Sequence, residues 1–472
     1  MTAFTHAEFA LTPAVERLAA ALVGQDEAIL DSRGWSWGDY DGLRLALIGT
    51  TQDLDDLAAD LLDRRAKMGN PPTVAQRLLA HHHIAYWDLR ALLTALDEEK
   101  FVKPPAEGEW PVQTTLFHIC RAERGFWGSI LIGFTGAQEG VARPFDGAQA
   151  HLLTGAADPA PQDTDGLSTM TTAYQRLHRA LLDDLQMIHD AELDAPSPFW
   201  EPAAPSVHFR IGRLTAHLHE HTVQIEKTLA VVAPQTEAHM HVRRLYRALA
   251  GVESALLGAP DLGYLCDDLA AELDARVAAV TQAIADIPAL FDAIRRGDAG
   301  TVHRLLQVNR KLVDAGDANR LSALMTAVYY HQKAIVQILR DAGAELDLFS
   351  AAAVGDLPEI EAHYEWNPRT VNWIARDGFT PLQLACFFSQ ETIVRYLLER
   401  GADVHAVSRN SMGLQALHAA VAGRNPAIVH ALIAAGADVT ARQAGGYTPL
   451  QAAQENNDEE ITAVLREAGA GE

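Results

Sequence analysis

Cysteine is scarce in this chain of 472 residues. The three cysteines, Cys120, Cys266 and Cys386, lie far apart, and no pair has the CxxC spacing of a redox or zinc motif. An odd number of dispersed cysteines is typical of proteins that fold in a reducing compartment. We therefore predict a cytoplasmic protein.

Positive charge is also sparse. The chain carries 38 Lys and Arg residues against 62 Asp and Glu residues, a formal net charge of -24. Such a surface repels phosphate backbones. We therefore predict that the protein binds no nucleic acid.

Long hydrophobic runs are missing as well. No stretch of about 18 uncharged apolar residues occurs, which predicts that no segment spans a membrane. The first 30 residues lack a basic start, and Glu16, Arg17 and Asp26 interrupt their apolar residues, so we expect no signal peptide.

The overall composition is that of a folded protein. Hydrophobic residues make up 48% and charged residues 21%, and the length suggests two or more domains. Apolar periodicity predicts an all-α protein. We expect four segments: a helical extension over 1–70, a four-helix bundle over 71–235, connecting helices over 236–284 and a repeat array over 285–472.

The bundle segment begins after Gly69-Asn70-Pro71-Pro72, where Thr73 and Gln76 form a capping-box pattern. Residues 141–166 are rich in Pro, Gly and Asp and are predicted to form a long loop between two helix pairs. The helices expected in the first 284 residues cover 13–30, 52–68, 73–98, 110–133, 167–192, 208–232, 236–257 and 264–284.

The last segment repeats itself. Leu382, Leu417 and Leu450 recur at intervals of 35 and 33 residues, within the segments TPLQLA, QALHAA and TPLQAA. This pattern resembles ankyrin repeats, and it implies five or six stacked helix pairs that bind a protein partner. The third unit follows almost directly on AELD, which predicts a shortened hairpin. Candidate tip residues are Asp377, Phe379, Asn410, Met412 and Tyr447.

Twenty histidines make any single spacing weak evidence. His217 and His221 are the only pair at i, i+4, and chance alone predicts roughly one such pair in this composition. The surrounding sequence adds weight, since RLTAHLHEHTVQIEKTL places this pair and Gln224 on one stripe of a helix beside an apolar stripe. His118 lies within another predicted helix, among apolar residues.

These segments together resemble the DinB/YfiT-like superfamily over about residues 73–232. The resemblance is carried by a Trp-opened helix with an L-x-H-I-x-x-A-E core and a later helix with H-x-x-x-H before Gln. It implies a metal triad of His118, His217 and His221. Three neutral imidazoles suit Zn²⁺ or Ni²⁺ and leave coordination positions open. The other possibility is three histidines packed without a metal.

Two functions remain open at this stage. The resemblance implies a metal-dependent enzyme of the thiol S-transferase or hydrolase type, in which a low-molecular-weight thiol is activated at the ion. The alternative is a non-catalytic ankyrin scaffold with a metal-stabilised helical bundle. No catalytic acid or base can be assigned from the sequence.

The remaining polar candidates receive structural interpretations. His81, His82 and His83 are about 100° apart on a helix, so at most one should lie near the triad. Glu123 lies off the face of His118, and we expect it to be solvated or a helix cap, with a supporting role at the triad as the other option. We expect Cys120 and Trp110 to pack in the core, although Trp110 could wall the site. His239 and His241 match no known spacing.

Overall fold

The structure is a computed structural model, and its described residues divide into two units. Unit 1 extends to Ile287, and unit 2 comprises Pro288–Asp317 and the residues from Leu321 onward. Both units are helical, apart from a pair of two-residue antiparallel strands, β1 (Ser36–Trp37) and β2 (Tyr40–Asp41). The described residues are 11–25, 27–30, 36–37, 40–141, 143–155, 160–201, 203–317 and 321–471.

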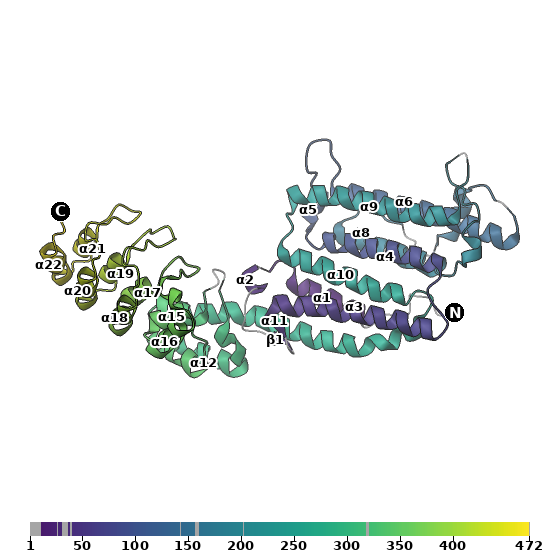
Figure 1. Ribbon diagram of the computed structural model, residues 1–472. Helices are drawn as coiled ribbons and strands as arrows, with labels where there is room; N and C mark the ends of the chain where they lie inside the picture. Colours follow the sequence, from purple (N-terminus) through teal and green to yellow (C-terminus); the bar gives the residue numbers. More distant parts are fainter. Residues whose placement is uncertain are drawn as a thin grey trace. The chain divides into compact units, whose positions relative to one another are not determined.

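The helices of unit 1 match most of the predicted ones, with different ends (Figure 1). Short 3-10 turns cover Asp190–Glu192 and Pro260–Cys266. The α-helices are α1 (Leu11–Leu22), α2 (Glu27–Leu30), α3 (Leu43–Lys67), α4 (Val74–Leu93), α5 (Glu98–Val102), α6 (Val112–Glu139), α7 (Gly147–Leu153), α8 (Leu167–Leu185), α9 (Val207–Val232), α10 (Glu237–Ala255) and α11 (Asp267–Arg296).

Three of the predicted helix and loop boundaries differ from the structure. The helix expected over 13–30 ends at Leu22, and Gly24 follows with a left-handed φ of 83°. The stretch 141–166 is not all loop, because Asp146 accepts hydrogen bonds from the first amides of α7 and caps it. The helix expected to end near 133 continues until Gly140 terminates it at φ 69°. The Thr73–Gln76 capping box is confirmed.

α10 lies at the centre of unit 1. It packs against α4 on one side and against α3 and α1 on another, while α4 also contacts α8 and α9. α6 packs against α9 and α8. The helices of the first 70 residues therefore reach the bundle through α10, and the four-part division predicted from the sequence stays a prediction.

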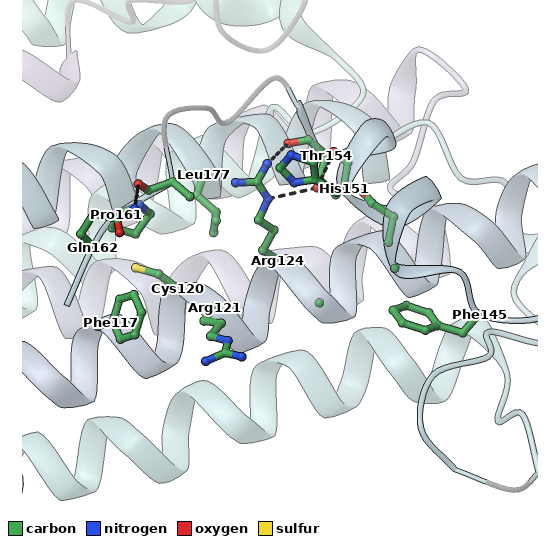
Figure 2. Close-up of a pocket in the computed structure, with 14 residues that line it drawn as sticks. Phe117, Cys120, Arg121, Arg124, Phe145, His151, Thr154, Pro161, Gln162 and Leu177 are labelled. Carbon is green, nitrogen blue, oxygen red and sulfur yellow. Dashed lines mark hydrogen bonds between the residues drawn. The ribbon is translucent and has the colours of Figure 1, made fainter.

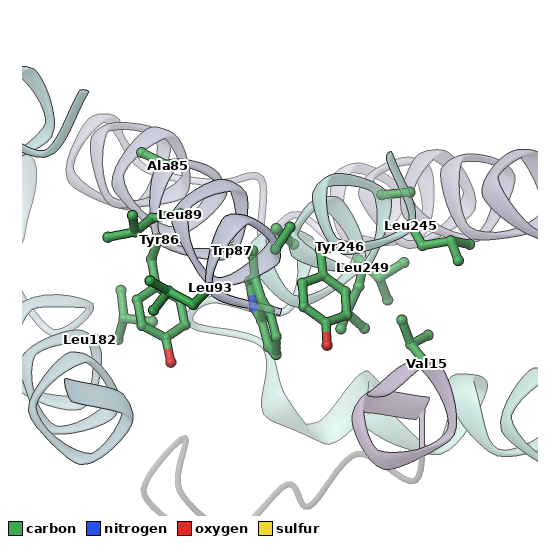
Figure 3. Packing of buried hydrophobic residues seen from close by; sticks show 14 of the residues in the cluster. Val15, Ala85, Tyr86, Trp87, Leu89, Leu93, Leu182, Leu245, Tyr246 and Leu249 are labelled. Atoms are coloured by element: carbon green, nitrogen blue, oxygen red, sulfur yellow. The ribbon is translucent and has the colours of Figure 1, made fainter. Parts of the chain in front are cut away.

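An aromatic stack joins α4 to α10. The Trp87 ring lies between Tyr86 and Tyr246, with ring centroids 5.6 Å and 5.0 Å away in edge-on contacts (Figure 3). Leucines from α4, α8 and α10 surround these rings, and all of them are buried. This packing fixes the register of α4, the helix that carries His82 and His83.

An ion-pair cluster joins the same helices near their surface. Asp88 of α4 accepts hydrogen bonds from Arg243 (2.6 and 2.7 Å) and Arg247 (2.5 Å) of α10. Arg243 also pairs with Glu226 of α9 at 2.5 Å. Burial by itself raises the pKa of Asp88, but the bonds from the two arginines outweigh it, so the pKa lies below its usual value.

We expect Asp88→Asn to destabilise unit 1 by about 2 kcal/mol at pH 7, because the half-buried Arg243 and the exposed Arg247 lose the opposite charge of a nearly buried carboxylate. The folded-state pKa lies below the unfolded one, so the contribution is complete above about pH 5 and is lost as the pH falls through the folded-state pKa. Denaturant titrations across this range measure it. Asp60→Asn, which removes an exposed pair with Arg64, is the control and should change little. If Asp88→Asn lost as much stability at low pH as at pH 7, the loss would not come from the charge of Asp88.

One helical stretch passes a simple test for membrane spans. By length and composition Pro260–Arg296 could cross a membrane, since its most apolar window has a mean hydropathy of 1.5, with 44% of that window buried. Core helices of soluble proteins pass the same test, so this is weak evidence. The expectation that no segment spans a membrane remains a prediction.

Unit 2 is a succession of short helix pairs (Figure 1). The end of α11 precedes α12 (Ala299–Val308), and 3-10 turns cover Arg310–Asp314 and Pro368–Asn372. The pairs that follow are α13 (Ala323–Tyr329) with α14 (Lys333–Asp341), α15 (Leu348–Val354) with α16 (Leu357–Trp366), α17 (Pro381–Phe387) with α18 (Glu391–Glu399), α19 (Ala416–Ala422) with α20 (Pro426–Ala434), and α21 (Pro449–Glu455) with α22 (Glu459–Glu467).

The third repeat has the reduced hairpin that the sequence predicts. Only residues 342–347 separate α14 from α15, whereas residues 400–415 separate α18 from α19. Asp347 caps α15 by accepting a hydrogen bond from the Ser350 amide, so the new helix starts almost at once. This confirms the predicted shortening.

Gln383 braces the hairpin of the following repeat. Its Nε2 donates to the carbonyl oxygens of Ala406 (2.8 Å) and Leu414 (3.0 Å), while its Oε1 accepts from the Thr380 amide. His418 holds the same position one repeat later and lies 3.2 Å from the Tyr447 carbonyl oxygen. The backbone of Ala441 also forms a hydrogen bond with His418, so the two side chains brace equivalent parts of successive hairpins.

We expect Gln383→Ala to destabilise unit 2 by about 2 kcal/mol, because two hairpin carbonyls lose their donor. Gln451→Ala is the matched control: Gln451 forms the same capping box with Thr448, but no further hairpin follows it in the described chain. Calorimetry of both variants separates the bracing bonds from the cap. Equal losses in the two variants would show that the cap alone matters.

Candidate functional site

The three histidines predicted as a triad come from two neighbouring helices. His118 lies in the second turn of α6, which begins after Trp110 and Pro111. His217 and His221 lie one turn apart on α9, whose N-cap Ser206 accepts a hydrogen bond from the Phe209 amide. Since α6 packs against α9, the two segments of sequence meet at one point. We call these three residues the histidine triad.

The triad converges through its Nε2 atoms. Nε2 of His217 lies 3.2 Å from Nε2 of His118 and 3.2 Å from Nε2 of His221. Two nitrogens bound to one ion at about 2.1 Å, at angles between octahedral and tetrahedral, lie about 3.0–3.4 Å apart. The observed spacing therefore fits ligands of a single transition-metal ion.

Neighbouring side chains orient the triad. Nδ1 of His221 lies 2.9 Å from Oε1 of Gln224, which can only accept, so Nδ1 carries the proton and Nε2 presents its lone pair. The His118 ring lies 5.6 Å from Trp110, and the His217 ring 5.6 Å from Phe126. Trp110 is 44% exposed, so the expectation that it packs in the core is wrong and it lies beside the site instead.

The electrostatics of His217 and His118 favour unprotonated imidazoles. Burial, followed by the proximity of His221 and His118, lowers the pKa of His217 to about 4. Burial and His221 also lower the pKa of His118. Neutral imidazoles are the form that binds a metal ion. His118 and His221 are half-buried, which leaves one side of the triad open.

Other histidines of α9 and α10 do not join the triad. His219 is exposed on α9 between the two triad members. His239 caps α10 through Thr236, and His241 lies 3.5 Å from Glu237. Cys120 is buried, as expected, and burial raises the pKa of its thiol well above the usual value.

The expectation for Glu123 is wrong, and a second cluster was missed. Glu123 is fully buried and accepts a hydrogen bond from Tyr174 at 2.9 Å. Its Oε1 lies 3.7 Å from Nε2 of the equally buried His82, and His178 of α8 completes the group. One ligand atom from each residue lies within 4.8 Å of the others. We call His82, Glu123 and His178 the core cluster.

Burial dominates the electrostatics of the core cluster. It lowers the pKa of His82 to about 3 and raises that of Glu123 to about 8. It also lowers the pKa of His178 far below its usual value. No local spacing in the sequence indicates this cluster, because its members come from three different helices.

A cavity of about 350 Å³ lies beside α6, on the side of Arg124 and Thr154 (Figure 2). Arg124 donates to the hydroxyl and carbonyl oxygens of Thr154, and these bonds join two parts of the cavity wall. Its wall includes Leu177, which precedes His178, and Cys120, which lies about one turn before Glu123, but it includes no member of the histidine triad. The cavity and the triad are therefore separate features.

Comparison with family models supports the two resemblances. The model of the DinB superfamily matches residues 81–225, which include both the triad and the core cluster. The model described as ankyrin repeats (3 copies) matches residues 290–408 and 348–443. The chain joins a DinB superfamily domain to ankyrin repeats. The all-α fold class predicted from the sequence is confirmed.

Curated relatives resemble only part of the chain. Ankyrin repeat and SAM domain-containing protein 6 of Rattus norvegicus is 34% identical over 119 residues, 25% of this chain and 13% of that protein. Putative ankyrin repeat protein L271 of Acanthamoeba polyphaga mimivirus is 36% identical over 94 residues, 19% of this chain and 13% of that protein. The chain thus covers a small fraction of these relatives. They support a protein-interaction array and leave the DinB domain without a named activity.

The candidate tip residues of the ankyrin hairpins have different roles. Asp377 accepts a hydrogen bond from the Tyr329 hydroxyl at 2.6 Å, and its carbonyl accepts one from Asn410 at 2.8 Å. These two predicted tip residues are occupied in bracing the hairpins. Met412 and Tyr447 are 48% and 40% exposed, so they remain candidates for partner contact.

Proposed function

We propose that the DinB domain is a metal-dependent enzyme of the thiol S-transferase or hydrolase type. The proposal rests on one observation: Nε2 of His217 lies 3.2 Å from Nε2 of both His118 and His221, and the last two residues are only half-buried. Closed structural sites use four protein ligands, whereas catalytic sites keep a position free. Three imidazoles suit Zn²⁺ or Ni²⁺.

The chain's own residues hold and orient the site. Gln224 fixes the tautomer of His221, and Phe126 supports the ring of His217. Trp110 provides an exposed aromatic wall against which part of a substrate could pack. A divalent ion held here supplies a Lewis acid that lowers the pKa of a thiol or water and polarises an electrophile.

The ankyrin array carries the second half of the proposal. Ankyrin repeats bind protein partners through their hairpins and concave face. We propose that the array binds a protein and so localises the DinB domain to its substrate or partner within the cytoplasm. The net charge of -24 favours a partner with a basic surface over nucleic acid.

The activity is tested by a screen of thiols and electrophiles. Untagged protein loaded with zinc or nickel is incubated with glutathione, cysteine or coenzyme A and a chromogenic aryl halide, and separately with an activated ester for hydrolysis. We expect a metal-dependent rate above the blank that His217→Ala/His221→Ala abolishes. If no pair reacts faster than the blank, the scaffold with a metal-stabilised bundle becomes the better description.

A further inference from the structure

The core cluster leaves four buried polar atoms without hydrogen-bond partners. They are both ring nitrogens of His82, Oε2 of Glu123 and Nδ1 of His178. The three side chains are at most 1% exposed. A buried polar atom without a partner costs about 1–3 kcal/mol, and folded proteins contain few of them. These atoms belong to three side chains that each bring one ligand atom within 4.8 Å of the others, which indicates a missing ligand.

The hydrogen bonds behind His178 determine which form its free nitrogen takes. Glu253 accepts hydrogen bonds from Thr12 (2.5 Å), Trp87 (2.6 Å) and Nε2 of His83 (2.7 Å). A carboxylate can only accept hydrogen bonds, so Nε2 of His83 carries a proton. In a neutral imidazole the other nitrogen, Nδ1, is then unprotonated and can accept a hydrogen bond. Nδ1 of His83 lies 2.9 Å from Nε2 of His178. With a neutral His83 ring, Nε2 of His178 donates to it and Nδ1 of His178 presents a lone pair.

This series of hydrogen bonds resembles the one that commonly orients a metal-bound histidine. A metal-bound histidine donates its second N–H to an acceptor, often a carboxylate. This hydrogen bond fixes the tautomer and makes the ring more basic. Here the series runs from His178 through His83 to Glu253. On the other side of the cluster, Tyr174 donates to Oε1 of Glu123 and leaves Oε2 free for a ligand.

A cation matches this arrangement better than a water molecule. Lone pairs are available from His82, Glu123 and His178, and a water molecule can donate to only two of them. A cation binds all three lone pairs, and it displaces the proton that burial favours on Glu123, so that the carboxylate offsets part of the charge of the cation. Two imidazoles and one carboxylate are a common donor set for Zn²⁺ and its neighbours.

We propose that the core cluster binds a second divalent transition-metal ion, held by His82, Glu123 and His178. The site differs from the histidine triad, because Glu123 and His118 are five residues apart on α6 and so point about 140° apart around the helix. Its ligands come from α4, α6 and α8, so the ion crosslinks three helices of the bundle. Because its ligands are at most 1% exposed and thus out of reach of a substrate, we assign the ion a structural role, with a water molecule in the position that three protein ligands leave open.

The test counts metal ions in untagged, full-length protein from cells grown with added zinc or cobalt. We expect about two ions per chain in the wild type, about one in His217→Ala/His221→Ala, and close to none when Glu123→Gln is added. His81→Ala is the matched control, since His81 is exposed beside His82, and it should keep both ions. In the cobalt-loaded triad variant, visible absorption should report a site of nitrogen and oxygen ligands.

The triad variant decides the question even if Glu123→Gln fails to fold. A folded His217→Ala/His221→Ala protein without metal would overturn the second site and leave the triad proposal standing. One ion in the wild type that survives in this variant would support the core cluster and remove the basis for the proposed enzyme. The two proposals can thus fail separately.

Discussion

His217→Ala/His221→Ala should lose one metal ion per chain relative to the wild type and keep its helical content. The two substitutions remove two of three ligands, and even the loss of a supporting residue weakens metal sites 10–100-fold. We therefore expect zinc affinity at the triad to fall by more than about a hundredfold. Plasma mass spectrometry after dialysis, with competition against a chromophoric chelator, measures the content and the affinity.

Two further variants show whether the effect belongs to the triad. His219→Ala removes an exposed histidine from the same stretch of α9 and should leave the metal content unchanged. Gln224→Leu removes the partner of His221 Nδ1 and should weaken zinc binding by about 10–100-fold without abolishing it. Equal metal content and affinity in the wild type and the double variant would show that the triad holds no ion.

The triad could be predicted because its information is local. His217 and His221 share a helix face by spacing alone, and the segment around His118 carries a recognisable motif. The structure then brings these segments together, with no adjustment to the residues chosen. A cluster of side chains from two short motifs can be predicted when each motif lies within one helix, and metal binding by this cluster stays a prediction.

The core cluster could not be predicted, because each of its members is an isolated residue in its own helix. His82 follows an exposed histidine and precedes another buried one, so its neighbours give no sign of its role. Glu123 was misjudged because a charged residue is almost always solvated. Only the packing of α6 against α8 shows that Tyr174 and His178 surround it. Burial of a carboxylate is a tertiary property.

The place of α10 was missed for a similar reason. Its sequence predicts a helix over 236–257, and the structure agrees closely. Because this helix carries no recognisable motif, the sequence places it only among the connecting helices. Much of α10 is buried, including the charged Glu253. The hydrogen bonds of Glu253 reach Thr12, 241 residues earlier in the chain, and no pattern in the sequence links the two.

The second large effect is expected at Glu253. Glu253→Leu leaves the hydroxyl of Thr12, the indole N–H of Trp87 and the imidazole of His83 without an acceptor inside the core. Unpaired buried donors cost about 1–3 kcal/mol each, so we expect a loss of about 4 kcal/mol. In a unit of this size that lowers the midpoint of thermal unfolding by about 10 °C.

Differential scanning calorimetry can assign this loss to one unit. The transition of unit 1 should move down, while the transition that Gln383→Ala moves should stay in place, because Glu253 and Gln383 belong to different units. Glu107→Gln changes an exposed carboxylate of unit 1 and should leave both transitions unchanged. A loss of unfolding free energy below about 1 kcal/mol for Glu253→Leu would mean that the three donors find other partners. Apolar packing can replace a carboxylate only when its former donors form hydrogen bonds elsewhere.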